Sequence, residues 1–192
     1  MRLPSFVRHA GTVATLVGLT LIVYAGVITF RARAHQEAFA VSLPSPPSDG
    51  EPVVREPIAE GLTIGEIQVD RIGLRTVIAQ GETDAILALG AGHLADTPWL
   101  DQRGNVVLAG HRDTVFRSLE QIRVGDVIDV TGHSVAMRYI VTSTTIVEPD
   151  DLSVLAGSSD NTLTLITCFP FVYIGHAPRR FIVRATEIAQ PF

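Results

Sequence analysis

The sequence predicts a mainly β domain with short helices, whose strands close or nearly close into a barrel behind an apolar N-terminal helix. Two observations support this prediction. Short segments rich in β-branched and apolar residues recur along the chain, and strands do not alternate regularly with helices as they would in a parallel sheet. The chain has 192 residues, which leaves room for one domain of ordinary size behind its N-terminal segments.

The apolar N-terminal segment covers residues 10–30 and contains no charged residue. A helix of that length spans roughly the 30 Å hydrocarbon core of a bilayer, so we expect a transmembrane helix here, after a short tail at residues 1–9. A cleaved signal peptide is the alternative. Its apolar region would be about 7–15 residues long, and residues 32–34 imitate its cleavage site. Arginines flank both ends, so the orientation follows from the short tail and large domain, which favour an N-terminus inside and a domain outside.

A proline-rich linker is expected at residues 31–59. Residues 42–57 alone contain five prolines together with Ser, Asp, Glu and Gly. This composition favours extended backbone and cannot build a core. The folded domain is therefore expected at residues 60–192, held away from a membrane by the linker.

Within the folded domain, apolar and polar residues alternate at period two and predict an opening hairpin. Strands are expected at residues 64–69, 74–79, 105–110, within 124–130, and at 136–147, 161–167 and 180–188. Short helical segments are expected at residues 83–89, 116–122 and 150–155. Residues 90–104 are expected to form a loop, because glycines and turn-forming residues interrupt the pattern there.

The single cysteine, Cys168, follows a predicted strand and comes two residues before Pro170. Proline cannot donate a hydrogen bond to a sheet, so the strand is expected to stop there and to leave the thiol near a loop mouth. One cysteine excludes an internal disulfide and any multi-cysteine metal site. Taken alone, it is consistent with either a reactive thiol or a small buried apolar residue.

Two other reactive side chains occupy equivalent positions: His111 ends one predicted strand, and Arg180 begins the strand after Cys168. Strand ends of a small barrel gather at two rims, so all three side chains can share one rim. An imidazole takes the proton of a thiol, and a guanidinium stabilises the oxyanion that forms when a thiolate attacks an amide. The set therefore indicates acyl transfer. Each member alone fits an ordinary loop or rim position, and Arg179 competes with its neighbour, because adjacent strand residues point to opposite faces.

Thr167, Asp113 and His93 are further candidates that support these three, and His93 also suits a structural or rim-lining position. No zinc-binding spacing of His or Cys occurs. The formal net charge is -5 and the chain has no Lys, so it lacks a basic footprint for nucleic acid. Neither a metal nor a nucleic-acid partner is expected.

Three motifs in this order resemble those of the sortases, the membrane-anchored cysteine transpeptidases of bacterial surfaces. Residues 164–168, Thr-Leu-Ile-Thr-Cys, resemble the TLxTC nucleophile motif of that family. Residues 109–114 resemble its histidine motif, and residues 180–184 resemble its arginine strand. The resemblance covers about residues 60–188. Within the family, the Cys-Phe-Pro-Phe run and residues 174–181 are similar to class D sortases or to related sortases of Gram-negative lineages.

The resemblance implies a closed eight-stranded sortase barrel, an N-terminal anchor in the cell membrane and a catalytic domain on the extracytoplasmic side. It implies that Cys168 attacks the Thr carbonyl of an LPxT-like sorting signal to give a thioacyl enzyme. His111 would then protonate the leaving amine and deprotonate the incoming one, while Arg180, and not Arg179, steadies the carbonyl oxygen. No cofactor is implied, and no acidic cluster resembles the calcium site of some sortases.

The implied partners are surface proteins that carry the sorting signal and an amine acceptor, either a cell-wall peptide or a pilin lysine. Two alternatives stay open at this point. A thiol hydrolase of the same fold would use water in place of the amine. A non-catalytic anchored β-domain would present a binding surface and keep Cys168 buried and inert.

Overall fold

The computed structural model describes residues 19–20 and 59–188. Leu19 and Thr20 are helical. The rest of the expected tail, apolar helix and linker lies outside the described residues, so these expectations stay predictions. In the described ranges, no helix has both the length and the apolar character that a membrane crossing requires.

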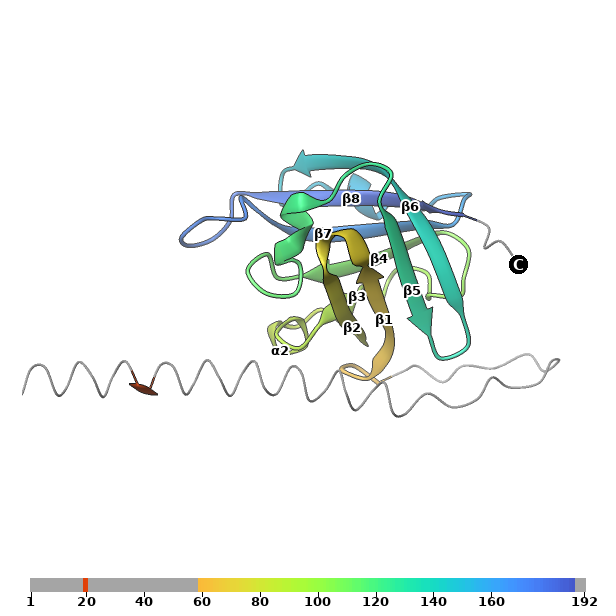
Figure 1. Ribbon diagram of the computed structural model, residues 1–192, viewed down its shortest axis with the longest axis horizontal. Helices are drawn as coiled ribbons and strands as arrows, with labels where there is room; N and C mark the ends of the chain where they lie inside the picture. Colours follow the sequence, from red (N-terminus) through yellow and green to blue (C-terminus); the bar gives the residue numbers. More distant parts are fainter. Residues whose placement is uncertain (1–18, 21–58, 189–192) are drawn as a thin grey trace, which may run out of the picture.

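Residues 59–188 form a closed barrel with the strand order β1-β2-β3-β4-β7-β8-β6-β5 (Figure 1). The strands are β1 Thr63–Val69, β2 Leu74–Gln80, β3 Ala91–His93, β4 Asn105–Gly110, β5 Val127–Gly132, β6 Ala136–Val147, β7 Thr162–Phe169 and β8 Arg179–Glu187. An antiparallel ladder between β1 and β5 completes the ring. The expected eight-stranded barrel is confirmed.

Short helical segments connect some of the strands: η1 Asp70–Ile72, α2 Asp84–Leu87, η2 Arg117–Gln121 and η3 Leu152–Leu155. The last three fall within the segments where helical turns are expected from sequence. Thr83 precedes α2, and its carbonyl accepts from the N–H groups of Ile86 and Leu87, while its side chain makes no capping hydrogen bond.

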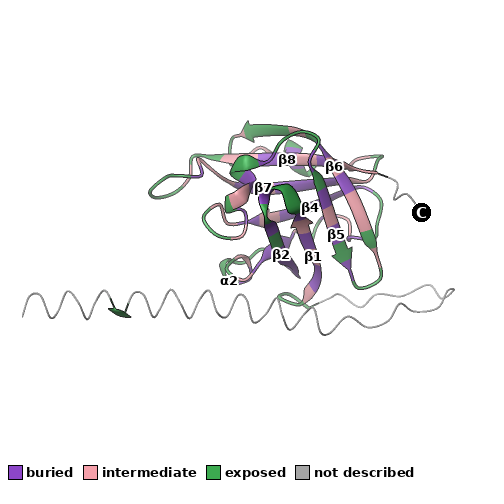
Figure 2. Ribbon diagram, in the orientation of Figure 1, coloured by how far each residue is buried: buried purple, intermediate pink, exposed green. Residues whose placement is uncertain are grey.

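The barrel is filled by side chains that alternate along each strand. On β4 and β7, Val106, Leu108, Leu163 and Leu165 are at most 1% exposed and belong to the central core. Burying one such side chain fully stabilises the fold by about 1.5–3 kcal/mol. Figure 2 shows buried residues along these strands and exposed ones in many of the connections. Period two then places the intervening residues of β7, including Cys168, on the outer face of the barrel.

The expectation of a loop at residues 90–104 is wrong, because β3 lies within it. Three residues, among them Ala and Gly, are too few for a periodic pattern to show. β3 is held by its neighbours: it pairs with β2 in parallel and with β4 antiparallel. β7 also ends at Phe169, two residues later than expected, because its ladder with β8 continues to the pair Phe169 and Arg179.

Candidate active site

Cys168 lies one residue before the end of β7, directly opposite Arg180 on β8. Directly opposed residues of an antiparallel pair have their side chains on one face, with Cβ atoms about 4.5–5.5 Å apart. Both residues are partly exposed, and the thiol is free. Arg180 Nη1 donates to the carbonyls of Arg179 at 3.1 Å and Ala177 at 3.4 Å. Cys168, with its partly exposed thiol, therefore has an arginine as its partner across the ladder and on the same face.

Arg179, the competing arginine, is placed differently. Its ladder partner is Phe169, and its guanidinium lies 5.4 Å from the centroid of that ring. Adjacent residues of a strand point to opposite faces, so Arg179 does not share the face of Cys168. Of the two arginines, the register places Arg180 opposite Cys168.

His111 directly follows β4, which runs parallel to β7. The ladder pairs Gly110 with Thr167, so the next residues, His111 and Cys168, continue the two chains side by side. Phe116 fixes the turn after β4. Its N–H donates to the His111 carbonyl at 3.0 Å, and a Cβ at position 110 would lie 2.5 Å from a carbon of its ring. Glycine at position 110 therefore lets Phe116 hold the turn that presents His111.

Thr167 supports this arrangement from inside the barrel wall. It is 1% exposed, and its hydroxyl donates to the Gly110 carbonyl at 2.7 Å. This bond ties β7 to β4 one residue before Cys168 and His111. Thr167 thus acts on the position of both strand ends without sharing their face.

The other two candidates are His93, at the end of β3, and Asp113, two residues after His111. His93 is completely buried, with Nδ1 2.8 Å from Gln80 Oε1 and Nε2 3.0 Å from the Pro98 carbonyl oxygen. Its ring stacks on Trp99 with centroids 5.1 Å apart. Burial lowers the pKa of His93, and the Pro98 carbonyl offsets part of that effect. His93 is therefore buried with a contact at each ring nitrogen, while Asp113 is exposed in the turn after β4.

Arg112 is a residue that the sequence analysis does not single out. Its Nη2 donates to the carbonyls of Tyr173 and Gly175, each at 3.1 Å, and its guanidinium lies 5.8 Å from the centroid of the Tyr173 ring. These contacts join the His111 turn to the connection that leads from β7 to Arg180. No local pattern indicates partners that are more than 60 positions away in sequence.

A largely aliphatic cavity of about 140 Å³ adjoins these residues on the outer face of the barrel. Arg180 lines it, together with Ile166 and Ile182, which are opposed partners on the same face as Cys168 and Arg180. The rest of the lining comes mainly from the β6–β7 connection: Glu148, Pro149, Asp151, Leu152, Val154 and Leu155, with Val147 and Leu94. An apolar recess therefore begins within two residues of the thiol.

Comparison with known proteins identifies the family. The family model of the sortase domain matches residues 67–188, more than half of the chain. The chain belongs to the sortase family. Sortase D of Bacillus subtilis is 35% identical over 129 residues, which are 67% of this chain and 65% of that relative. This sortase thus spans just under two thirds of the length of that curated relative.

Solved sortase structures agree with this assignment. A Clostridium perfringens Sortase D5 transpeptidase matches with a TM-score of 0.63 at 32% identity, covering 69% of this chain and 83% of that one. An X-ray structure of Clostridium perfringens sortase C with the C-terminal cell wall sorting motif matches with a TM-score of 0.64 at 26% identity, covering 69% and 74%. The expected resemblance to sortases, class D among them, is confirmed.

In this sortase, Asn105 holds the wall of the cavity. Asn105 is completely buried at the start of β4, and its Nδ2 donates to the carbonyls of Val154 at 3.0 Å and Ala156 at 3.1 Å. Its Oδ1 accepts from the Thr164 hydroxyl at 2.6 Å. The side chain therefore fastens the end of η3 to the barrel. A polar residue at the head of an apolar strand is the only hint of this role in the sequence.

The described residues of this sortase contain no group of three or more His, Cys, Asp or Glu side chains arranged to hold a metal ion. The neighbouring strand ends of β4, β7 and β8 carry an imidazole at His111, a thiol at Cys168 and a guanidinium at Arg180. This set can make a nucleophile, transfer a proton and stabilise an oxyanion.

Proposed function

We propose that this sortase is a membrane-anchored cysteine transpeptidase that cleaves an LPxT-like sorting signal after Thr and transfers the protein to an amine. One observation carries the proposal. Cys168 is opposed to Arg180 across the β7–β8 ladder, beside the strand end that presents His111 and next to an aliphatic cavity. A nucleophile, an acid–base group, an oxyanion donor and a binding recess are the parts that acyl transfer needs.

In the first step, the sulfur of Cys168 attacks the carbonyl carbon of the signal's Thr. The carbonyl oxygen becomes an oxyanion beside the Arg180 guanidinium, whose charge and fork of N–H donors stabilise it. The C–N bond then breaks, and His111 gives a proton to the leaving amine. A thioester on Cys168 and a free peptide amine result.

In the second step, the amine of the acceptor attacks the thioester. His111 accepts a proton from this amine, a new amide bond forms, and the C–S bond breaks to release the Cys168 thiolate. Arg180 again lies beside the oxygen that carries the negative charge. The acceptor is an amine of a cell-wall peptide or of a pilin lysine.

The aliphatic cavity is evidence for an LPxT-like signal, because the Leu and Pro side chains of such a signal need apolar surface that is removed from water. Ile166 and Ile182 form a floor for such side chains, and η3 supplies a wall. The structure of Clostridium perfringens sortase C with its cell wall sorting motif is further support from a relative.

An anchor at residues 10–30 would place the enzyme in the cell membrane as a single-pass protein, with its catalytic domain on the extracytoplasmic side. The charge-free apolar run of that segment supports this location. Substrates that are retained in the same membrane would meet the enzyme at a raised effective concentration.

The test uses the full chain in detergent with LPxT-type peptides. We expect cleavage after Thr and, by mass spectrometry, an acyl adduct on Cys168 that a Cys168→Ala variant lacks. Wild-type turnover by Cys168→Ala would contradict the proposal.

Adding an amine nucleophile separates transfer from hydrolysis. A transpeptidase converts most of the acyl enzyme into the amide product when the amine is present, whereas a hydrolase gives the same acid product with or without it. A native protein that neither cleaves any signal peptide nor reacts with iodoacetamide would instead be a non-catalytic β-domain with an inert thiol.

A further inference from the structure

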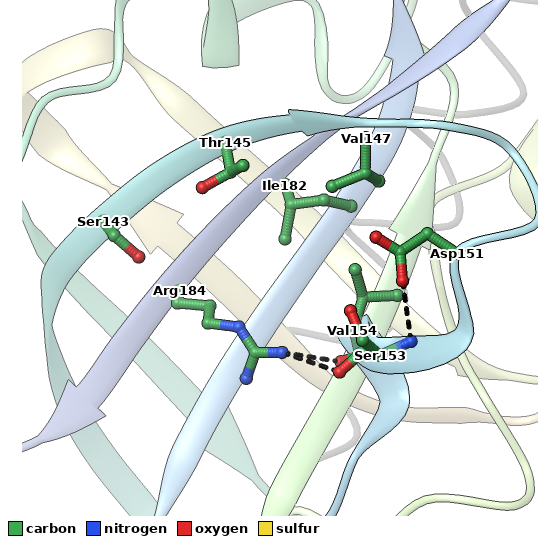
Figure 3. A pocket seen from close by; sticks show the side chains of 8 residues that line it. All are labelled: Ser143, Thr145, Val147, Asp151, Ser153, Val154, Ile182 and Arg184. Atoms are coloured by element: carbon green, nitrogen blue, oxygen red, sulfur yellow. Dashed lines mark hydrogen bonds between the residues drawn. The ribbon is translucent and has the colours of Figure 1, made fainter.

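A second cavity of about 240 Å³ continues from the aliphatic one along the outer face of β6 and β8 (Figure 3). The two cavities share four lining residues: Val147, Asp151, Val154 and Ile182. The first cavity contains Arg180 and the second contains Arg184. A recess along β8 thus leads away from the site of acyl transfer.

The second cavity is lined by several polar side chains, whereas the first is lined mainly by aliphatic ones. The hydroxyls of Ser143, Thr145 and Ser153 line it together with Arg184. Arg184 Nη2 donates to the carbonyls of Ser153 at 3.1 Å and Val154 at 3.3 Å, which orients the guanidinium (Figure 3). These two bonds hold a cation at the wall of the recess.

Within residues 59–188, no carboxylate forms an ion pair with Arg184, and its Nε and Nη1 groups have no hydrogen-bond partner there. Four of the other arginines of the barrel differ in this respect: Arg71, Arg75, Arg117 and Arg138 are each paired with a carboxylate. Arg184 therefore retains donors and a positive charge for a ligand.

The spacing along β8 relates this cation to the substrate. Arg180 and Arg184 are four residues apart on one strand, so they share a face and are about 13 Å apart at about 3.3 Å per residue. An extended peptide advances by the same distance per residue. With the Thr of an LPxT-like signal at Cys168, the residues just before its Leu reach the second cavity.

We propose that the second cavity is a subsite for the one or two residues that precede the Leu of the sorting signal, and that Arg184 makes it prefer an acidic side chain there. The proposal rests on the proposed function and extends it from the signal itself to the residues upstream. The Arg184 guanidinium would bind the carboxylate, and the Ser143 and Thr145 hydroxyls would donate further hydrogen bonds.

A carboxylate, that of Asp151, also lies at the second cavity and works against this preference for an acidic side chain. Its carboxylate lines both cavities, and Oδ1 accepts from the Ser153 N–H at 2.9 Å. Hydrogen bonds from Ser153 lower the pKa of Asp151, so the group is ionised at neutral pH. Its negative charge weakens the preference for an acidic substrate, which makes Asp151→Asn a useful variant. Asn also serves well as an N-cap, so η3 keeps its cap.

The experiment compares peptides that differ only in Glu, Gln or Lys at the two positions before Leu. For the wild-type full chain, we expect kcat/KM to be about three- to ten-fold higher with Glu than with Lys, mainly through KM, as for a partly exposed ion pair. In Asp151→Asn, the preference for Glu should increase.

Two further variants isolate the role of Arg184. Ser143 is the ladder partner of Arg184, so Ser143→Asp supplies an internal carboxylate and should abolish the preference without removing the bonds to η3. Ser134→Asp adds the same charge in the exposed β5–β6 turn and should leave the preference intact. If the wild type cleaves the Glu and Lys peptides equally well, the subsite is wrong and the proposed function stands. If no peptide is cleaved, both are wrong.

Discussion

Cys168 and Arg180 are directly opposed partners in the β7–β8 ladder, so the backbone register itself places the two side chains on one face of the barrel, with their Cβ atoms adjacent. Neither residue depends on a loop for this relationship. A slip of the ladder by one residue would bring Arg179 opposite Cys168 or move the thiol to the other face.

Replacing Arg180 by Ala should lower kcat/KM for an LPxT-type peptide by about 100- to 1,000-fold, the usual effect of losing one oxyanion donor. Arg180→Lys should lose much of the same activity, because an ammonium lacks the planar fork of donors. Steady-state kinetics on the full chain measure both effects. Arg179→Ala is the matched control and should stay close to wild type, since Arg179 pairs with Phe169; a larger loss in this variant would show that the wrong arginine has been chosen.

Replacing Thr167 by Val should lower the free energy of unfolding by about 1–3 kcal/mol. The variant keeps the size of the side chain but removes the buried hydroxyl that donates to the Gly110 carbonyl. Thr167→Ser keeps the hydroxyl and should lose less. Urea denaturation followed by fluorescence gives both values. Equal stability of the Val variant and the wild type would mean that this bond does not hold β7 to β4.

Replacing Asn105 by Asp should loosen the β6–β7 connection. The side chain keeps its shape, but a carboxylate oxygen then faces the Val154 and Ala156 carbonyls in place of a donor. We expect faster proteolysis within residues 148–160, a raised KM and a loss of about 2–4 kcal/mol of stability.

Thr164→Val is the control for this experiment. It removes the hydroxyl that donates to Asn105 Oδ1 and leaves the two carbonyl contacts of Nδ2 in place. The control should lose about 1 kcal/mol of stability without faster cleavage in the connection. Similar proteolysis of both variants would contradict a specific role for the Nδ2 contacts.

Because of His93, the folded protein should be less stable in mild acid than at neutral pH. Burial lowers the pKa of His93 in the folded protein, whereas the unfolded chain binds a proton near the ordinary value of about 6.5. Below that pH the unfolded state binds more protons, so the free energy of unfolding should fall as the pH drops from 7 to 5. Denaturation at several pH values measures the slope, and His93→Gln should flatten it. A slope that is unchanged in the variant would assign the acid sensitivity to other groups.

The strand-end positions of the three candidate residues could be predicted from sequence, because β-branched runs and punctuating residues mark where strands stop. The pairing of residues between neighbouring strands could not be predicted in this way. Period two indicates that Arg179 and Arg180 face opposite ways, but only the ladder shows which of them opposes Cys168. The choice of Arg180 from sequence depended on the family resemblance.

The contacts that hold the walls of the cavities could also not be predicted from the sequence. Asn105 binds carbonyls 49 and 51 positions away, and backbone carbonyls carry no sequence pattern of their own. β3 was missed for a related reason: its three residues are a strand only because β2 and β4 lie on either side. The expected tail, anchor and linker at residues 1–9, 10–30 and 31–59 stay predictions, apart from the helical state of residues 19–20.

The β6–β7 connection walls both cavities, whereas the thiol, the imidazole and the guanidinium are set by the pairing of β4, β7 and β8. Under the proposed function, one wall of the substrate recess thus comes from a connection, whereas β7 and β8 carry the reacting groups and the floor of the recess. We therefore expect mutations in residues 148–160 to change substrate recognition more than they change the transfer step. A fold divided in this way is a natural starting point for new recognition, both in evolution and in the design of protein ligases.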